Sequence, residues 1–110
     1  MNRQETGLLG EWRAAQYLKR HGMRILERRF RAGHDEIDLI AREGETVVFV
    51  EVKARPRGRL TDGARAVDQD KRRHLRDAAY CYLARHPAGQ VRFDVVEITA
   101  AGIRHIKNAF

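Results

Sequence analysis

Residues 36–53 read EIDLIAREGETVVFVEVK, and this stretch decides the fold. Two runs rich in β-branched and apolar residues, 36–42 and 46–53, lie on either side of Glu43-Gly44-Glu45. β-branched residues favour strands, and a short connection that contains glycine is typical of a β-hairpin. The stretch therefore predicts two adjacent antiparallel strands.

The segments before and after this hairpin predict two helices and further strands. Leu8, Trp12, Ala15 and Leu18 recur at helical spacing, and a second long helix ends before Pro87. A helix between two strands indicates a parallel crossover. We therefore predict one α/β domain over residues 1–110, with a mixed β-sheet flanked by helices. The helices are expected at about residues 7–21 and 64–86, and the strands at about 23–30, 36–42, 46–53, 91–98 and, as a short last one, 103–106.

The composition is that of a basic protein with a normal apolar content. The 110 residues are 43% hydrophobic, and 22 Lys and Arg against 15 Asp and Glu give a net charge of +7. No apolar run reaches the roughly 20 residues of a transmembrane helix, and the N-terminus lacks the apolar core of a signal peptide. Cys81 is the single cysteine, which excludes an intrachain disulfide and a cysteine-based metal cluster. We expect a soluble cytoplasmic protein without a membrane span.

The basic residues gather in clusters that consist mostly of arginine, which binds phosphate bidentately. The clusters are Arg28, Arg29 and Arg31, then Arg55, Arg57 and Arg59, then Lys71, Arg72 and Arg73. The middle cluster falls in a loop expected over residues 54–62, which contains Pro56 and Gly58. A basic domain attracts nucleic acids and anionic membranes alike, and a solvated surface has the same composition. The charge alone therefore leaves the partner open.

Five charged residues interrupt the apolar pattern of elements that are expected to pack together, namely Glu11, Asp38, Glu51, Lys53 and Lys71. Glu11 falls within the apolar stripe of the first helix, and Asp38 lies between two apolar residues of its strand. Each has an ordinary structural interpretation, such as a solvated pair, a strand-edge charge or a side chain that reaches solvent. The alternative is one shared site, because a buried carboxylate is costly unless it is paired or bound to metal.

A shared site of this composition has a specific chemistry. Two or three carboxylates without cysteine or histidine form an oxygen-rich site that suits Mg²⁺ or Mn²⁺. Such an ion lowers the pKa of bound water and stabilises charge on a phosphoryl oxygen. A lysine beside it orients the water or neutralises the transition state, and a basic surface attracts a polyanionic substrate. The combination indicates hydrolysis of phosphodiester bonds.

The order of Asp38 on one hairpin strand and Glu51-Val52-Lys53 on the next resembles the PD-(D/E)xK nuclease superfamily, whose core order is αβββαβ. The chain is most similar to the YraN-like family of small bacterial proteins within that superfamily. The resembling stretches are 7–18 (GLLGEWRAAQYL), 36–41 (EIDLIA), 48–55 (VFVEVKAR), 66–75 (AVDQDKRRHL) and 92–98 (RFDVVEI). The resemblance implies a restriction-endonuclease-like fold related to archaeal Holliday-junction resolvases.

By this resemblance Glu11, Asp38, Glu51 and Lys53 are the catalytic residues. The three carboxylates bind Mg²⁺ or Mn²⁺ with the Val52 carbonyl as a candidate further ligand, and Lys53 orients the nucleophile. The implied substrate is structured DNA, and a resolvase that cuts two strands acts as a homodimer. The expected nucleic-acid contacts are Arg55, Arg57, Arg59, Lys71 and Arg72. A non-catalytic nucleic-acid-binding module with the same fold and a protein-interaction domain with merely solubilising charges stay open as alternatives.

The sequence departs from the family's pattern at Asp35, because the family usually has glycine before the EIDL stretch. Aspartate replaces a turn glycine at modest cost in the left-handed region, and it also adds a charge near the expected metal. His34 and His74 fall near the same expected site. Neither has a partner at ligand spacing, so both are interpreted as surface histidines.

Four further residues receive structural interpretations. Cys81 is expected to pack within the second helix rather than to react. Asp94 interrupts an apolar strand and is expected to pair with an arginine. Trp12 and Tyr82 are interpreted as core residues, with the alternative that an exposed Trp12 stacks on a base.

Overall fold

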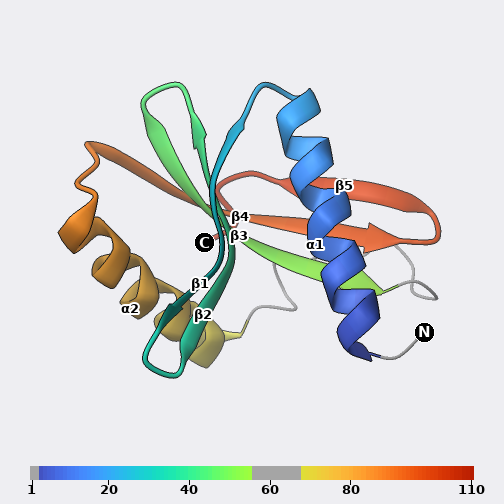
Figure 1. The fold of residues 1–110 in the computed structure, drawn as a ribbon, viewed down its shortest axis with the longest axis horizontal. Helices are drawn as coiled ribbons and strands as arrows, with labels where there is room; N and C mark the ends of the chain where they lie inside the picture. Colours follow the sequence, from blue (N-terminus) through green and yellow to red (C-terminus); the bar gives the residue numbers. More distant parts are fainter. Residues whose placement is uncertain (1–2, 56–67) are drawn as a thin grey trace.

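A computed structural model describes residues 3–55 and 68–110, with two helices and five strands among them (Figure 1). The elements are α1 (Arg3–Arg20), β1 (Arg24–Ala32), β2 (Asp35–Glu43), β3 (Thr46–Arg55), α2 (Gln69–Arg85), β4 (Gln90–Thr99) and β5 (Gly102–Ile106). The predicted order of elements is confirmed, including the short last strand. Of the helices described, neither has an apolar stretch long enough to cross a membrane.

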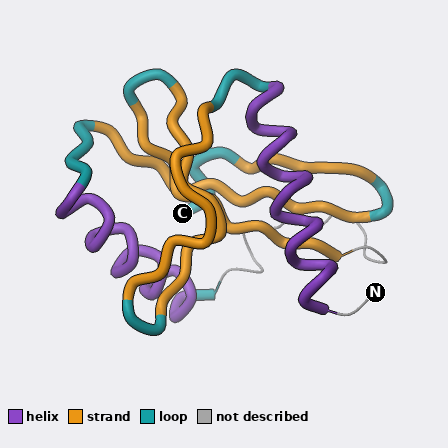
Figure 2. Tube along the Cα trace, in the orientation of Figure 1, coloured by secondary structure: helices purple, strands orange, loops and turns teal. Residues whose placement is uncertain are grey.

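The strands form one mixed sheet in the order β1-β2-β3-β4-β5 (Figure 2). β1, β2 and β3 are successive antiparallel neighbours, β3 and β4 are parallel, and β5 is antiparallel to β4. The predicted hairpin is confirmed, with a positive φ at Gly44 in its turn. The predicted parallel crossover is confirmed as well, because α2 lies between β3 and β4 in the chain.

One helix covers each face of the sheet, which gives three layers (Figure 1). β3 is buried from both sides, because Val48 and Val50 face α1 whereas Val47 and Phe49 face α2. The continuous apolar run of β3 follows from this burial. The α1 side of the core also contains Ala14, Ala15, Leu18, Leu39, Val96 and Ile98, and the α2 side contains Ile37, Ile40, Leu75, Ala78, Tyr82 and Val95.

α1 crosses β3 in very close contact at Gly10. A Cβ atom placed on Gly10 would lie 2.7 Å from the Cβ of Ala54, so the crossing accommodates only glycine. Gly10, Ala14 and Leu18 are all buried and, at a spacing of four residues, form the row that faces the sheet. This crossing fixes the next residue, Glu11, beside the carboxyl-terminal end of β3.

The predicted apolar stripe of α1 is wrong at two positions. Trp12 is 53% exposed and Leu8 is 45% exposed, whereas Ala15 and Leu18 are buried as predicted. The close contact at Gly10 is the physical reason, because the row that faces the sheet near the crossing must consist of small side chains. The large side chains of this half of α1 therefore lie on the outer side of the helix.

α2 begins at Gln69 in the described part of the chain, and the predicted start at Ala64 lies outside that part. Asp68 has an extended backbone, and its side chain accepts a hydrogen bond from the Lys71 amide at 2.8 Å, which is the geometry of an N-cap. Residues 56–67, which contain most of the predicted basic loop, lie outside the described residues.

Cys81 and Tyr82 are adjacent residues of α2 that differ in burial. Tyr82 is buried, and its ring packs edge-on against Phe30 and Phe49, so its assignment to the core is confirmed. Cys81 is exposed, so the prediction that it packs is wrong. Consecutive residues of a helix point about 100° apart, and the burial of Tyr82 turns Cys81 toward solvent.

Asp94 is a fully buried carboxylate of β4 with several partners. The predicted arginine pair is Arg92, whose Nε donates to Oδ1 at 2.8 Å, and Nε2 of His105 lies 2.7 Å from Oδ2. The amide of Asn108 donates to Oδ1 at 2.9 Å. Burial by itself raises the pKa of this carboxyl, but the hydrogen bonds of His105, Arg92 and Asn108 bring the pKa below its ordinary value. The cluster therefore ties β5 and the residues after it to β4.

We predict that Asp94→Asn lowers the free energy of unfolding by about 3 kcal/mol at neutral pH, because an amide cannot supply the two anionic oxygens that Arg92, His105 and the Asn108 amide contact. Since the pKa of Asp94 is depressed on folding, its contribution is present above the ordinary carboxyl pKa and is lost as the pH falls through the folded value. The difference between wild type and variant should therefore shrink below about pH 4. Urea denaturation across this range measures it, and a difference independent of pH would contradict the prediction.

Candidate metal centre

β2 and β3 separate beyond the hairpin, and Asp38 lies at the point of separation (Figure 1). The backbone ladder between the two strands ends at the pair of Leu39 and Val50. Just beyond it, Oδ2 of Asp38 accepts a hydrogen bond from the Val52 amide at 2.8 Å. A side chain thus replaces the backbone acceptor that β2 no longer supplies to β3.

β1 is irregular at the same level. Arg29 lies beside Asp38 and has a φ of 51°, a left-handed conformation that is uncommon for a residue other than glycine. Its Nε donates a hydrogen bond to Oε2 of Glu11 at 2.8 Å. Strained backbone of this kind persists only where the surrounding structure enforces it, and here it accompanies an ion pair between β1 and α1.

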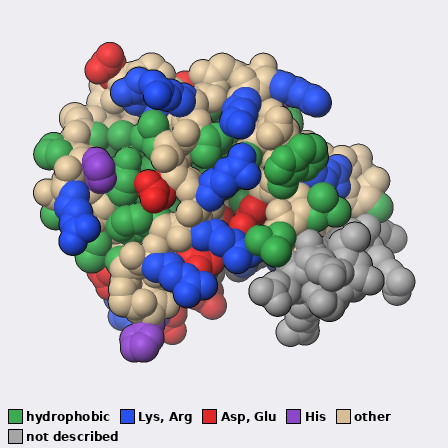
Figure 3. All heavy atoms as spheres, in the orientation of Figure 1, with side chains coloured by type: hydrophobic (Ala, Val, Ile, Leu, Met, Phe, Trp, Pro, Cys, Tyr) green, Lys and Arg blue, Asp and Glu red, His purple; other side chains and the backbone are tan. Residues whose placement is uncertain are grey.

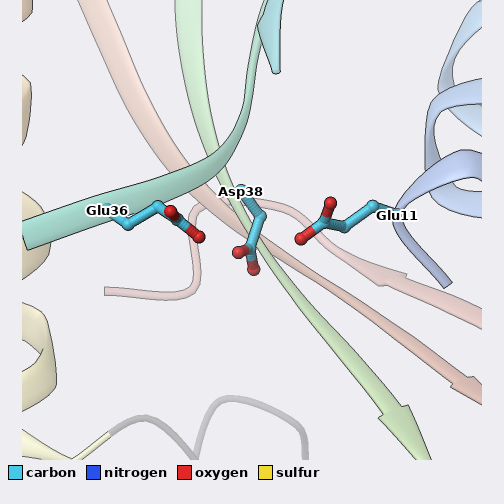
Figure 4. A group of neighbouring side chains, drawn as sticks. All are labelled: Glu11, Glu36 and Asp38. Atoms are coloured by element: carbon cyan, nitrogen blue, oxygen red, sulfur yellow. The ribbon is translucent and has the colours of Figure 1, made fainter. Parts of the chain in front are cut away.

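Three carboxylates converge beside this irregularity. Glu11, Glu36 and Asp38 each offer an oxygen that lies within 4.8 Å of those of the other two (Figure 4). Glu11 points toward Asp38 from α1, and Glu36 points toward it from the opposite side (Figure 4). Glu36 was not among the predicted site residues. Its signal in the sequence is the Glu-x-Asp spacing, which places the two acids on one side of a strand.

Glu51 is a further carboxylate outside this group of three, and its side chain is deeply buried at only 6% exposed. Its Oε1 lies 3.5 Å from Nζ of Lys53 and 3.8 Å from Nζ of Lys71. Its Oε2 is buried and has no hydrogen-bond partner within the described part of the chain. Because a buried acceptor without a partner is costly, this oxygen is suited to receive a cation.

The pKa of Asp38 is raised to about 7. Burial is the largest cause, and the neighbouring negative charge of Glu51 is the second. The hydrogen bond from the Val52 amide acts in the opposite direction, while Glu11 raises the pKa further and Lys71 lowers it. Asp38 is therefore close enough to Glu51 and Glu11 for their negative charges to raise its pKa.

The arginines of β1 form ion pairs with the two outer carboxylates of the cluster. Nε of Arg29 lies 2.8 Å from Glu11, and Nε of Arg31 lies 2.8 Å from Glu36. Asp38, between them, forms no ion pair within residues 3–55 and 68–110. The donors are all carboxylate oxygens, which are the ligands that Mg²⁺ and Mn²⁺ prefer. The residues therefore fit a divalent cation at the three converging carboxylates. The buried Oε2 of Glu51, which has no partner within the described residues, is a candidate further ligand.

Of the predicted residues, Glu11 and Asp38 converge together with Glu36. Glu51 lies outside this group and pairs with Lys53 and Lys71, and its negative charge raises the pKa of Asp38. Arg55 is exposed at the end of β3. Arg57 and Arg59 lie outside the described residues. The guanidinium of Arg72 lies 5.2 Å from the centre of the Phe110 ring, so this side chain has an aromatic partner of its own.

The turn between β1 and β2 has its left-handed residue at Gly33, with a φ of 64°, and not at Asp35. Asp35 is the first residue of β2 and pairs with Ala32, so the expected left-handed conformation there is wrong. Its Oδ1 lies 2.7 Å from Nδ1 of His74, a partner that the sequence did not predict. His34 and His74 are exposed as predicted, and both line an open pocket of about 240 Å³. The other residues that line it are Asp35, Glu36 and Lys71.

This chain, an α/β protein with a carboxylate cluster where β2 and β3 separate, matches one protein family along most of its length. Residues 10–98 match the family described as "Uncharacterised protein family UPF0102". The chain therefore belongs to the UPF0102 family, and the predicted YraN-like relationship is confirmed.

Its relatives in this family are similar over the full length. The chain is 44% identical over 116 residues to a UPF0102 protein of Geobacter metallireducens, with 100% of this chain and 95% of that protein covered. It is 42% identical over 118 residues to a UPF0102 protein of Caldicellulosiruptor saccharolyticus, with 100% of both covered. A UPF0102 protein of Syntrophomonas wolfei is 43% identical over 116 residues, again with 100% of both covered.

We predict that Asp38→Asn stabilises the metal-free protein at neutral and alkaline pH. Because folding raises the pKa of Asp38, the stability of the wild type falls as the pH rises from about 4 to about 7. Asparagine stays neutral and still accepts the bond from Val52, so the variant avoids up to about 4 kcal/mol of this loss. Urea denaturation in EDTA at about pH 5 and about pH 8 measures the effect.

Glu45→Gln is the matched control for this experiment, since Glu45 is an exposed carboxylate in the turn between β2 and β3. Its stability should follow the wild-type dependence on pH. Parallel profiles for Asp38→Asn and the wild type would show that the Asp38 carboxyl titrates in its ordinary range.

Proposed function

We propose that the protein is a Mg²⁺- or Mn²⁺-dependent nuclease of the restriction-endonuclease-like fold. It hydrolyses phosphodiester bonds of structured DNA, as Holliday-junction resolvases do. The observation that carries the proposal is the buried Oε2 of Glu51, which has no partner within the described residues, on a carboxylate whose charge raises the pKa of Asp38. Removal of a carboxylate oxygen from water is costly unless a donor or a cation replaces the water. The PD-(D/E)xK pattern of Asp38 and Glu51-Val52-Lys53 supports the same conclusion.

Each carboxylate has a proposed role. Asp38 and Glu51 hold the ion, and the carbonyl of Val52, which lies between Glu51 and Lys53, is a further candidate ligand. Glu11 completes the coordination or positions a water. When bound, the ion lowers the pKa of a water molecule and stabilises negative charge on the phosphoryl oxygen.

Lys53 is the proposed group that orients the attacking water or neutralises the transition state. Its Nζ and that of Lys71 approach the same oxygen of Glu51, at 3.5 Å and 3.8 Å. The two ammonium groups thus gather on one oxygen and leave the other for the ion. Both lysines are partly exposed, so they reach the side from which a substrate phosphate arrives.

The surface charge supports a polyanionic substrate. The net charge is +7, and Figure 3 shows Lys and Arg side chains on both sides of acidic side chains on one face. The proposed partner is therefore a nucleic acid, and a homodimer would present one site to each of two strands. The proposed contacts to its backbone are Arg55, Arg57, Arg59, Lys71 and Arg72.

A non-catalytic nucleic-acid-binding module is the second candidate, and two ion pairs favour it. Arg29 and Arg31 neutralise Glu11 and Glu36 without a metal, so part of the cluster is balanced by the protein itself. Such a module binds nucleic acid in a salt-sensitive, metal-independent way and cuts nothing.

We predict that Mg²⁺ or Mn²⁺ raises the melting temperature of the wild type and of Lys53→Ala, but not that of Glu51→Gln. A ligand at a hundred times its dissociation constant adds about 2.7 kcal/mol to the free energy of unfolding, or roughly 10 °C for a domain of this size. Glu51→Gln removes a charge that holds the ion, whereas Lys53→Ala leaves both proposed ligands in place. Thermal melts in millimolar metal and in EDTA measure the shift, with Glu45→Gln as the control that keeps it.

The same variants separate catalysis from binding. Both Glu51→Gln and Lys53→Ala should lose Mn²⁺-dependent cleavage of a labelled panel of duplex, flap, four-way-junction and single-stranded DNA, while their binding persists. A wild type that binds the panel but cuts none of it in Mn²⁺ would support the binding module instead. Cleavage by both variants at the wild-type rate would place the activity elsewhere.

A further inference from the structure

The outer side of α1 carries an exposed apolar patch that consists of Leu8, Leu9 and Trp12. These residues are 45%, 45% and 53% exposed, and Trp12 is the only tryptophan of the sequence. Leu8 and Trp12 are one helical turn apart, so their side chains are neighbours. Figure 3 shows hydrophobic side chains at the surface over α1, next to Lys and Arg side chains.

This patch borders the candidate metal centre. Trp12 directly follows Glu11, whose carboxylate is one of the three that converge, and Gly10 rests on Ala54 of β3, next to Lys53. Because consecutive helical residues point about 100° apart, the indole ring projects from α1 in a different direction from the Glu11 carboxylate. The turn of α1 that supplies Glu11 to the cluster therefore also presents the indole ring to solvent.

We propose that Trp12 is a stacking platform for an unpaired base next to the scissile phosphate. The preferred substrate is then a nucleic acid with unpaired nucleotides at the site. The inference rests on the proposed function and specifies its substrate class. In a duplex both faces of a base are covered by its neighbours, whereas an unpaired base offers a face to an aromatic ring. Single strands, flaps and junctions with open bases meet this requirement, and a blunt duplex does not.

Charge and area favour a nucleic acid over a second copy of this chain as the occupant of the patch. Exposed Arg13 follows Trp12, and exposed Arg55 follows Ala54 at the end of β3. Two copies would bring these like charges together, whereas a phosphate backbone neutralises them. A stable interface also buries about 800 Å² on each partner, far more than three partly exposed side chains provide.

The single tryptophan makes the test direct, because the protein's tryptophan fluorescence reports on Trp12 alone. Wild-type protein in EDTA is titrated with a fluorescein-labelled single-stranded oligonucleotide and with a blunt duplex of the same sequence. Stacking should quench the emission with the single strand, in parallel with the anisotropy of the label. The duplex should bind with little change in emission.

Three variants isolate the contribution of the ring. Trp12→Ala should weaken single-strand binding roughly tenfold, equivalent to about 1.4 kcal/mol, and change duplex affinity less than about twofold. Trp12→Phe keeps an aromatic face and should retain most of the affinity. Leu9→Ala removes apolar area from the same patch and should bind like the wild type. The proposal is wrong if Trp12→Ala binds single strands as tightly as the wild type, or if Leu9→Ala loses as much as Trp12→Ala.

The remaining outcomes distinguish the platform from the proposed function. If the emission depends on protein concentration without nucleic acid, and Trp12→Ala prevents self-association, the patch is an interface between copies and the platform is wrong. If the wild type cuts DNA in Mn²⁺ and Trp12→Ala cuts every member of the panel equally fast, only the platform fails. If the wild type neither binds nor cuts any member, the proposed function fails and the platform fails with it.

Discussion

The hydrogen bond from the Val52 amide to the Asp38 carboxylate is the interaction on which the candidate site depends. It closes the fork at which β2 leaves β3, just beyond the last backbone pair of the two strands. Val52 lies between Glu51 and Lys53, so this one bond fixes the position of both residues relative to Asp38. It also uses only one oxygen of the carboxylate, which leaves the other for a ligand. α1 completes the arrangement, because its close crossing of β3 carries Glu11 to the same fork.

The order of the elements could be predicted because strand alternation and helical spacing are local signals. Glu11, Asp38 and Glu51 could be identified for the same reason, since each interrupts an apolar pattern. The exposure of Trp12 could not, because it depends on how closely α1 approaches β3, which is a tertiary contact. Glu36 joins the cluster where β2 has left β3, and a strand pattern alone does not show where two strands separate.

The folded protein is more stable when Asp38 is protonated, whereas the proposed function requires an ionised Asp38. Burial and the charge of Glu51 raise its pKa to about 7, so the ionised carboxylate weakens the folded state at neutral pH. The protein offsets the outer charges with arginines of β1, one of them held in a left-handed backbone, whereas Asp38 has no ion-pair partner in the part of the chain that the structure describes. Asp94 shows the opposite solution, since its buried carboxylate is saturated with donors that lower its pKa.

Under the proposed function, the ion, the proton and the fork form one linked equilibrium. A divalent ion that binds Asp38 must displace the proton that burial retains there, so ion binding strengthens as the pH rises toward the pKa of about 7. Once bound, the ion removes the repulsion between Asp38 and Glu51. The separation of β2 from β3, beyond which Oε2 of Glu51 is buried without a partner among the described residues, then costs the folded protein less. The ion would therefore stabilise the same fork that the Val52 bond closes, and the instability of the ion-free site is what makes ion binding favourable.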